Sequence, residues 1–445
     1  TLPGFRPEVG DMFGQKKHGG FLAPGMDFAF GFTGDDYIDR ALQNDWLICN
    51  DSVVSPASSN ALEDLQLRIS LEPIRDLKID LTANRTRNRS REIQYMFEGM
   101  PDTRSGNFSM SIISIGSAFE RPSAGDGYHS GTFERFRRNL DVIRDRVESQ
   151  FLGAQYPQGS TLAGKTFDPA NGTISKHSPD VMIPAFLAAY TGKSARNSAL
   201  DFFPSLFSMM PNWRITYTGL TKIAWFKKNF RSVNLNHAYR STYSVGSYNT
   251  FQSFMSYMGD IGFVEDVQSG NPIPSSRFDI SMVSINEQFS PLIGMDATLK
   301  NGLTAKVEYK TSRILNLSMS ACQLVETASR DFVIGLGYKI VNFNLFSARN
   351  VKDSKNRVSH DLALRADISF RNQSALCRDI QQGFAQATNG NKALKISCSA
   401  DYTLSRLLTL RLYYDRQQNT PLVSSSSYPV VSADFGFSMK FSLTR

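Results

Sequence analysis

Strict alternation of apolar and polar residues over two neighbouring stretches, 277–299 and 303–323, constrains the fold of this chain most. The apolar members of the second stretch share one parity: Leu303, Ala305, Val307, Tyr309, Leu315 and Leu317. The residues between them are polar: Thr304, Lys306, Glu308, Lys310, Ser312 and Asn316. Successive side chains of a β-strand point to opposite faces, so each stretch is predicted to be a strand with one apolar and one polar face. The second strand would run for about twenty residues, against about five or six in an ordinary strand. Such length is typical of a wall that crosses a membrane at a tilt and extends beyond it.

Lys300, Asn301 and Gly302 separate the two stretches. If Leu299 and Leu303 oppose each other, the connection is a three-residue hairpin loop with glycine in the left-handed conformation. The pattern therefore predicts one very long antiparallel hairpin.

The same alternation recurs along most of the chain and divides it into four parts. Residues 1–60 are rich in Gly and Pro, with a possible strand over 26–32 and a short helix over 37–46. Residues 61–119 and 212–445 are predicted to be barrel strands, and residues 120–211 a helix-containing insertion. The predicted strands cover 62–71, 77–91, 108–119, 213–218, 230–245, 332–340, 362–370, 394–404, 408–414 and 431–443.

Inside the insertion, the hydrophobic period changes from two to between three and four. Apolar residues recur at this spacing from Phe133 to Phe151, which predicts an amphipathic helix ending near Gly153. Residues 179–190 are apolar enough for a second helical turn or two. Short turns of outer-membrane barrels lie on one side, and the turns at 72–76, 300–302 and 405–407 satisfy that rule only if one more strand exists. We expect it near 243–257, and about fourteen wall strands in all.

Several broad classes of protein are excluded by composition and motifs. The sequence contains no run of about eighteen apolar residues, so it predicts no transmembrane helix. The four cysteines lie far apart and form no metal-ligand pair, and the five histidines are scattered. No nucleotide, metallopeptidase or hydrolase motif is present, so we expect no enzyme, no cofactor, no metal and no catalytic residue. The formal charge of +8 is spread out, which favours anionic lipid headgroups over nucleic acid. The chain starts without a signal peptide, and we expect a mature or excised piece.

The polar faces of the predicted strands carry charges at mid-strand. In a β-sandwich these charges would face water and the apolar faces would form a core, whereas in a barrel they would line an aqueous lumen. Strand length and aromatic residues near strand ends favour the barrel. We therefore predict an all-β, antiparallel transmembrane β-barrel. The predicted lipid-facing residues are Leu364, Ile368, Phe370, Phe435, Phe437 and Phe441, and the predicted lumen-facing residues are Lys306, Glu308, Arg365 and Asp367.

Four arginines continue the apolar parity of the strand that starts at Leu77. Arg85, Arg87, Arg89 and Arg91 form either a ladder bound to lipopolysaccharide phosphates or a solvated extension of that strand.

Long stretches of the chain resemble the C-terminal part of the SprA/Sov family, the outer-membrane translocon of the type IX secretion system. They are MPDTRSGNFSMS (100–111), DVMIPAFLAAYTGK (180–193), PNWRITYTGL (211–220), NLNHAYRSTYSVGS (234–247), FSPLIGMDATLKNGLTAKVEYKTSR (289–313), VIGLGYKI (333–340), NTPLVSSSSYP (419–429) and the closing FSLTR. The resemblance runs from about residue 3 to residue 445.

The resemblance implies the C-terminal arc of a very large single-chain barrel of about 36 strands, the size of the largest known. Such a pore passes folded cargo proteins with C-terminal signals from the periplasm to the surface of a Gram-negative cell. The expected partners are the cargo, a PorV-type shuttle barrel, a periplasmic plug protein, the N-terminal remainder of the same translocon and outer-membrane lipid. These residues alone would then be one arc of a wall, with edges that need other strands.

Two other interpretations remain open from the sequence. A self-contained outer-membrane porin of about fourteen strands would require the first and last strands to pair. A soluble β-sandwich surface protein would need no detergent.

Overall fold

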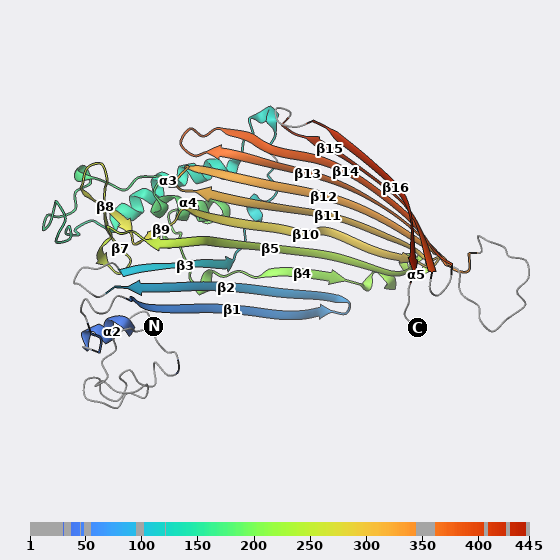
Figure 1. The fold of residues 1–445 in the computed structure, drawn as a ribbon, viewed down its shortest axis with the longest axis horizontal. Helices are drawn as coiled ribbons and strands as arrows, with labels where there is room; N and C mark the ends of the chain where they lie inside the picture. The colour runs from blue at the N-terminus through green and yellow to red at the C-terminus, as the bar shows by residue number, and fades with distance from the viewer. Residues whose placement is uncertain are drawn as a thin grey trace, which may run out of the picture.

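The computed structural model describes residues 30, 37–44, 46–48, 55–94, 102–120, 122–343, 361–404, 408–423 and 428–441. These residues form mostly antiparallel β-sheet with few helices, so the all-β prediction holds at this coarse level. Most strands belong to one long, open sheet, with the two longest helices over one end of it (Figure 1). The possible strand over 26–32 falls almost wholly outside the described residues, as does the loop 405–407.

The sheet that we call the wall contains 13 strands, and β6, β7 and β8 form a separate three-stranded sheet. The wall strands are β1 Ala57–Ile74, β2 Leu77–Ile93, β3 Asp102–Ser111, β4 Asn212–Tyr217, β5 Phe230–Thr250, β9 Phe278–Asp279, β10 Met282–Leu299, β11 Leu303–Ser318, β12 Gln323–Ile340, β13 Leu362–Asp379, β14 Ala385–Thr403, β15 Leu408–Pro421 and β16 Val430–Phe441. The small sheet has β6 Met255–Met258, β7 Ile261–Glu265 and β8 Pro272–Ser276. The α-helices are α2 Tyr37–Gln43, α3 Gly131–Ser149, α4 Pro179–Tyr190 and α5 Ala224–Asn229. The 3₁₀ helices are η3 Ile115–Ser117, η4 Ala124–Asp126, η5 Pro169–Asn171, η6 Leu206–Ser208 and η7 Gly219–Lys222.

The wall follows the order β1-β2-β3-β5-β10-β11-β12-β13-β14-β15-β16, with β4 and β9 beside this path. β1 and β16 lie at its two edges, and no pairing joins them among the described residues. The described wall is therefore an open arc, and closure into a barrel is not seen in it.

One position in the wall is shared by two short strands. β2 pairs with β4 over Leu77–Thr82 and with β3 over Arg85–Ile93, and β5 pairs with both. The chain leaves the wall after Ser111 and returns at Asn212, and we call residues 112–211 the insertion. Asn212 Nδ2 donates to Ser111 Oγ at 3.1 Å, which joins the two ends of the break.

The described wall has 13 strands, against the predicted number of about fourteen, and the strand expected over 26–32 lies almost wholly outside the described residues. Eleven strands follow one another along the path, because β4 shares a position with β3 and the two-residue β9 pairs only with the end of β5. The extra wall strand expected near 243–257 is wrong, since β5 continues to Thr250 and the following residues form the small sheet. The β1–β2 and β10–β11 turns nevertheless lie at the same end of the wall (Figure 1), because the shared position restores the alternation of strand directions.

The hairpin of β10 and β11 has the predicted register. Thr298 faces Thr304 across the ladder, and residues 300–302 form the loop. Gly302 has φ 89°, the left-handed conformation that favours glycine. The Leu303 N–H donates to Asn301 Oδ1 at 3.1 Å, which satisfies a backbone donor inside the loop.

Several predicted boundaries are wrong, and two of them lie where the chain turns. The turn placed at 72–76 contains only Arg75 and Asp76, because β1 continues to Ile74 through a register shift. Asp76 adopts φ 70°, which aspartate tolerates better than most residues. The strand placed over 108–119 ends at Ser111, where the chain turns into the insertion and η3.

α3 and α4 cover the two helical segments predicted in the insertion. Ser130 caps α3 by accepting a hydrogen bond from the Phe133 N–H. The apolar stripe of α3 is buried, and Phe136 meets Phe186 of α4 edge to face, with ring centroids 6.0 Å apart. α4 is buried on nearly every side. None of the helices in the described part of the chain combines the length and the hydropathy that a membrane-spanning helix requires.

Candidate functional site: a wall with two different faces

The register of the wall places the apolar residues of every long strand on one side, which we call the apolar face. One row across β12 to β16 contains Tyr338, Leu364, Ala400, Leu412 and Phe437. At the end of the wall away from α3 and α4, this face is open to its surroundings. We call these exposed side chains the band: Ile293, Phe332, Leu336, Tyr338, Leu364, Ile368, Phe370, Leu412, Phe435, Phe437, Met439 and Phe441.

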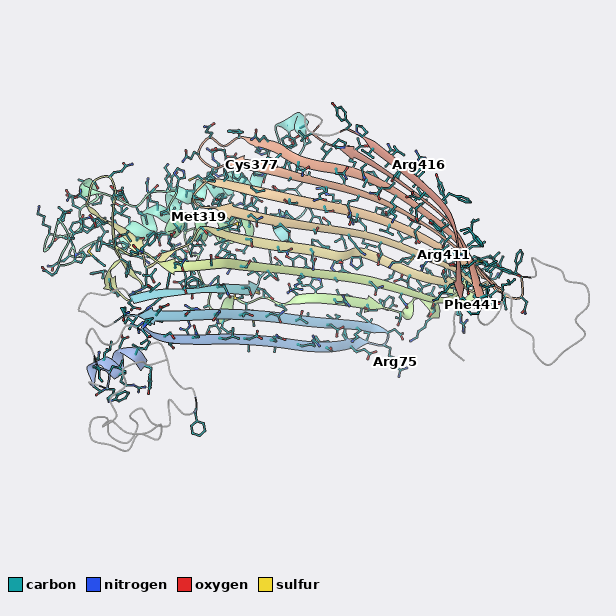
Figure 2. The ribbon with its side chains drawn as sticks, in the orientation of Figure 1. Arg75, Met319, Cys377, Arg411, Arg416 and Phe441 are labelled. Atoms are coloured by element: carbon teal, nitrogen blue, oxygen red, sulfur yellow. The ribbon has the colours of Figure 1, made fainter. Side chains whose placement is uncertain are left out.

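All six residues predicted to face lipid belong to the band. Their exposed fractions run from 39% for Leu364 to 73% for Phe435. In Figure 2, Phe441 lies at the end of the wall farthest from α3 and α4, while Met319 and Cys377 lie at the end that α3 and α4 cover. The structure therefore places the six on one exposed apolar surface, and their contact with lipid stays a prediction.

The four residues predicted to face a lumen lie on the opposite, polar face. Lys306 and Asp367 stand on either side of Gly335 in one row across β11, β12 and β13. A Cβ at Gly335 would lie 2.6 Å from Asp367 Oδ1, so a larger residue there would require the Asp367 carboxylate to move. The Glu308 carboxylate pairs with Lys306 at 3.1 Å and with Lys310 at 2.9 Å.

The polar face carries further ion pairs on the next strands. Arg371 Nε lies 2.9 Å from Asp331 Oδ1, and Arg365 Nε lies 3.7 Å from Asp367 Oδ2. Both signs of charge alternate over this face, so it presents a hydrated surface without one dominant charge.

The insertion covers the other end of the apolar face. Ile285, Leu315, Leu317 and Leu324 of the wall are fully buried in one core with α3 and α4. The Tyr243 hydroxyl of β5 donates to the Phe202 carbonyl of the insertion at 3.1 Å. The apolar face is therefore dry protein interior at one end and an exposed band at the other.

A buried ion pair marks where the insertion is fastened to the wall. Arg313 Nη2 of β11 donates to Glu287 Oε2 of β10 at 2.8 Å, with side chains 8% and 2% exposed. Arg313 also donates to the Ser117 carbonyl and hydroxyl, both at 2.7 Å. Ser114 and Tyr239 donate to Glu287 Oε1 at 2.6 and 2.8 Å. Because both charges are hydrogen-bonded on several sides, they can remain buried.

A second buried pair fastens the insertion to β12 and β13. Arg378 donates to Glu326 at 3.1 and 3.2 Å and to the Tyr128 carbonyl at 2.7 Å. The Arg378 guanidinium also lies 5.5 Å from the centre of the Phe133 ring. From α3, Arg137 Nε donates to the Ile380 carbonyl at 3.1 Å.

Glu120 organises the start of α3. Its carboxylate accepts from the Ser130 and Thr132 hydroxyls and from the Thr132 N–H. Burial opposes the charge of Glu120, but these hydrogen bonds outweigh it and hold the pKa of Glu120 below its ordinary value. The Glu120 carbonyl also accepts from Arg330 Nη2 at 3.4 Å.

The structure gives the four arginines of β2 partners inside the protein. Arg85 and Arg89 both pair with Glu63, at 3.1 and 2.6 Å, and Arg85 lies over the Phe108 ring at 5.3 Å. Arg87 lies over the Phe203 ring at 4.9 Å. Contact with lipopolysaccharide stays a prediction for these arginines.

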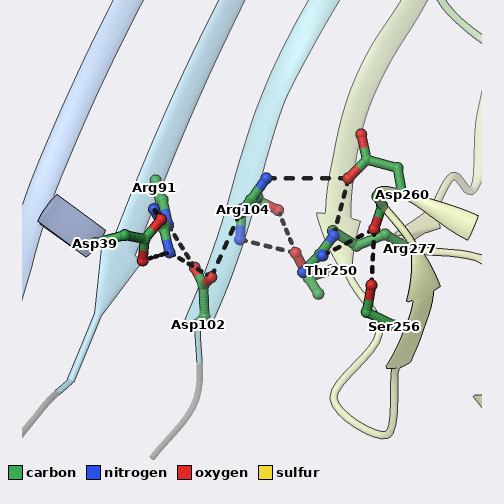
Figure 3. A network of polar contacts seen from close by, with 9 residues as sticks. Asp39, Arg91, Asp102, Arg104, Thr250, Ser256, Asp260 and Arg277 are labelled. Carbon is green, nitrogen blue, oxygen red and sulfur yellow. Dashed lines mark hydrogen bonds and ion pairs between the residues drawn. The ribbon is translucent and has the colours of Figure 1, made fainter. Parts of the chain in front are cut away.

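Arg91 is buried and belongs to a network that ties the N-terminal helix to the wall (Figure 3). Its guanidinium donates to both oxygens of Asp39 at 2.7 and 2.8 Å, and to Asp102 at 2.8 and 2.9 Å. Thr250 Oγ1 accepts from the Arg104 N–H at 2.8 Å, and Asp260 pairs with Arg277 at 3.0 Å. The network therefore links α2, β2, β3, β5 and the small sheet.

The sequence prediction missed the buried charges at the insertion. A signal was present, because Arg313 and Glu287 interrupt the apolar parity of their strands. A charge on the apolar face of a strand needs partners, and here the two charges pair with each other while Ser114 and Ser117 of the insertion add hydrogen bonds. Within the described residues, no three His, Cys, Asp or Glu side chains are grouped to hold a metal ion.

No protein-family model and no curated protein matches this chain. Among solved structures, the chain is similar to in-vitro folded OmpT, an outer membrane protein of Vibrio cholerae in its trimer form. The match covers 87% of this chain and 99% of that chain, with 9% identity and a TM-score of 0.22. At that TM-score the likeness carries no argument about function.

Proposed function

We propose that this chain is the C-terminal arc of a protein-export pore in the outer membrane of a Gram-negative bacterium, of the SprA/Sov type. The observation that carries this proposal is the contrast between the two faces of one wall. Apolar side chains are exposed over adjacent strands on one face, and ion pairs cover the other. In a membrane the first face meets hydrocarbon and the second faces a water-filled lumen.

The height of the band supports a membrane. On β13 the apolar face that carries the band has no polar residue from Leu362, which is partly exposed, to Phe370. That is eight steps of about 3.4 Å, or about 27 Å along the strand. A strand tilt of about 40° reduces this to roughly 21 Å, near the ~25 Å apolar belt of outer-membrane barrels. The remaining half of β13 would then project beyond the bilayer.

The open edges of the wall favour the interpretation as an arc of a larger barrel and not as a self-contained barrel. β1 and β16 each have one strand neighbour in the described wall. An edge strand in a membrane leaves backbone donors and acceptors unsatisfied in hydrocarbon. The N-terminal remainder of the same translocon would supply the missing neighbours.

Transport through such a pore needs no catalytic residue, and we propose none. The cargo would be folded proteins with C-terminal signals, received at the surface by a PorV-type shuttle barrel, with a periplasmic plug protein closing the pore. These partners rest on the family resemblance, whereas the mixed charges of the polar face suit passage of varied protein surfaces without tight binding.

Photo-crosslinking in living cells tests the proposal. A photoreactive amino acid is placed at Asp367 or Lys306 on the polar face and, as matched controls, at Ile368 or Leu364 on the band. During secretion, the first pair is expected to form adducts with cargo and the second pair with lipid. Equal cargo adducts from both faces, or none from Asp367 and Lys306 while secretion proceeds, would overturn the export function.

A cysteine pair separates the arc from a closed porin. One cysteine replaces Gln66 on β1 and the other replaces Ser438 on β16, in the full-length protein. An arc forms no disulfide between them, whereas a barrel closed within these residues brings the two edges together.

A further inference from the structure

Apolar side chains of the insertion are exposed along its margin nearest the band. Phe207 is 96% exposed, Leu206 46% and Met210 40%, all in or next to η6. Phe119, at the start of the insertion, is 54% exposed. Side chains of this kind gathered at one margin indicate a surface that meets an apolar partner.

On both β4 and β10, this margin lies next to the point where the apolar face becomes exposed. The Met210 N–H donates to the Ser111 carbonyl at 3.1 Å, just before β4 brings Trp213 onto the apolar face. The Phe119 ring lies 5.4 Å from the Phe289 ring of β10, after which Ile293 is 67% exposed.

β12 shows the same change from a contact with the insertion to an exposed apolar side chain, on the far side of the insertion. Arg330 donates to the Glu120 carbonyl, and the next residue of the same face, Phe332, is 41% exposed. The insertion therefore ends, and the band begins, at a common level across the wall.

A cavity of about 370 Å³ lies beside the same loop. Met110 and Ile112 of the chain leaving the wall, Leu187 of α4 and Met210 supply its apolar lining, and Lys193 also lines it. A hydrocarbon chain fits such a lining, and the Lys193 ammonium could pair with a phosphate at the headgroup level.

We propose that the insertion rests on the bilayer outside the pore, with Phe207, Leu206, Met210 and Phe119 in the boundary between headgroups and acyl chains. The occupant is the lipid of the surrounding membrane, because this margin is continuous with the band. This inference rests on the proposed membrane function, and it places the insertion against the outer surface of the wall, away from the lumen.

The opposite end of the band is bounded in a similar way. Trp225, Phe226 and Phe230 form an aromatic cluster at the far end of the wall, with ring centroids 4.9 to 5.8 Å apart. Aromatic side chains gather at both interfaces of membrane proteins because their rings suit the headgroup level. Phe119 and Phe207 would then belong to one belt and the Trp225 cluster to the other.

Spin-label accessibility in the full-length protein tests the inference. After the four native cysteines are replaced by serine, single cysteines are introduced as Phe207→Cys, Ile368→Cys and Val267→Cys. Val267 is 99% exposed between β7 and β8, so it serves as the matched aqueous control. Each label is read in lipid nanodiscs for collisions with oxygen, which concentrates in acyl chains, and with a water-soluble nickel chelate.

The oxygen-to-nickel ratio at Phe207 is expected to exceed that at Val267 and to remain below that at Ile368, which lies deeper. A Phe207 ratio equal to that of Val267, with Ile368 still in lipid, overturns this inference and leaves the proposed function standing. Shielding of the Phe207 label from both reagents also overturns it, since protein would then cover the loop. A water-like ratio at Ile368 overturns both proposals.

Discussion

The two ends of the apolar face carry the same alternation and meet different surroundings. At one end, Leu315 and Leu317 are completely buried beneath α3 and α4. At the other, Leu364 and Ile368 are 39% and 45% exposed on the same face. Alternation thus determines which face is apolar, while the partner of that face depends on whether another part of the chain returns to cover it.

Charges sharpen the contrast between these ends. Under the insertion, the apolar face admits Glu287, Arg313, Glu326 and Arg378, each paired and hydrogen-bonded. Between 362 and 370, by contrast, the same face of β13 carries only Leu, Leu, Ala, Ile and Phe. A protein interior can supply partners for a buried charge, and hydrocarbon cannot.

The largest expected effect is at the covered end. Arg313→Met would leave the Glu287 carboxylate buried without its cation and should lower the free energy of unfolding by about 3–5 kcal/mol. The double variant Glu287→Gln with Arg313→Met should recover much of that loss. Denaturant unfolding in detergent measures both, and a double variant no more stable than Arg313→Met would show that the pair is not the cause.

Truncation of a leucine compares the ends directly. Leu315→Ala leaves a cavity in dry protein and should cost about 2–5 kcal/mol. Leu364→Ala should cost clearly less in a bilayer, because lipid fills the space that the side chain leaves. Equal losses for the two variants in lipid would mean that Leu364 is covered by protein.

A charge tests the band at mid-depth. Ile368→Lys should cost about 2–4 kcal/mol in a bilayer, whereas Asp367→Asn on the polar face should remain within roughly 0.5 kcal/mol. Folding titrations in lipid vesicles measure the difference. Equal tolerance of the two substitutions would contradict the assignment of faces.

The smallest effect concerns a carboxyl group inside the insertion. Burial raises the pKa of Asp180 above its ordinary value of 3.8, although the Ser276 N–H donates to it. The folded protein therefore holds this proton more tightly than the unfolded chain, and stability falls as pH rises from 3.8 to the raised value. Asp180→Asn keeps an acceptor oxygen for Ser276 and should remove this dependence, leaving a variant at least as stable at pH 7. Urea unfolding across pH 4–8 checks it, and an unchanged pH profile in the variant would refute the assignment to Asp180.

Much of the wall could be predicted from sequence, since alternation marks strands wherever one face is apolar. It indicated β12 only over 332–340 and β13 only over 362–370, although both strands are about twice as long. The missing halves contain Arg330 and Arg378 on the apolar face, and each donates to a backbone carbonyl of the insertion, so the pattern fades where the insertion supplies polar partners.

The shared wall position could not be predicted for a related reason. β4 has six residues, and its pairing with β2 depends on contacts far away in the chain. The buried charges were visible only as breaks in parity, because nothing local to Arg313 or Arg378 indicates that Ser117 and Tyr128 meet them.

The break between β3 and β4 has a consequence for the order of assembly. β1 and β2 can pair from their own two-residue turn outward. β4 can pair with β2 only after residues 112–211 have brought Asn212 back to Ser111. Closing so long a loop carries an entropic penalty that a local hairpin avoids. The wall position shared by β3 and β4 is therefore filled only after the insertion has folded. A chain with a misfolded insertion would lack β4 at this position, and the unpaired edge of β2 would be open to recognition by cellular quality control.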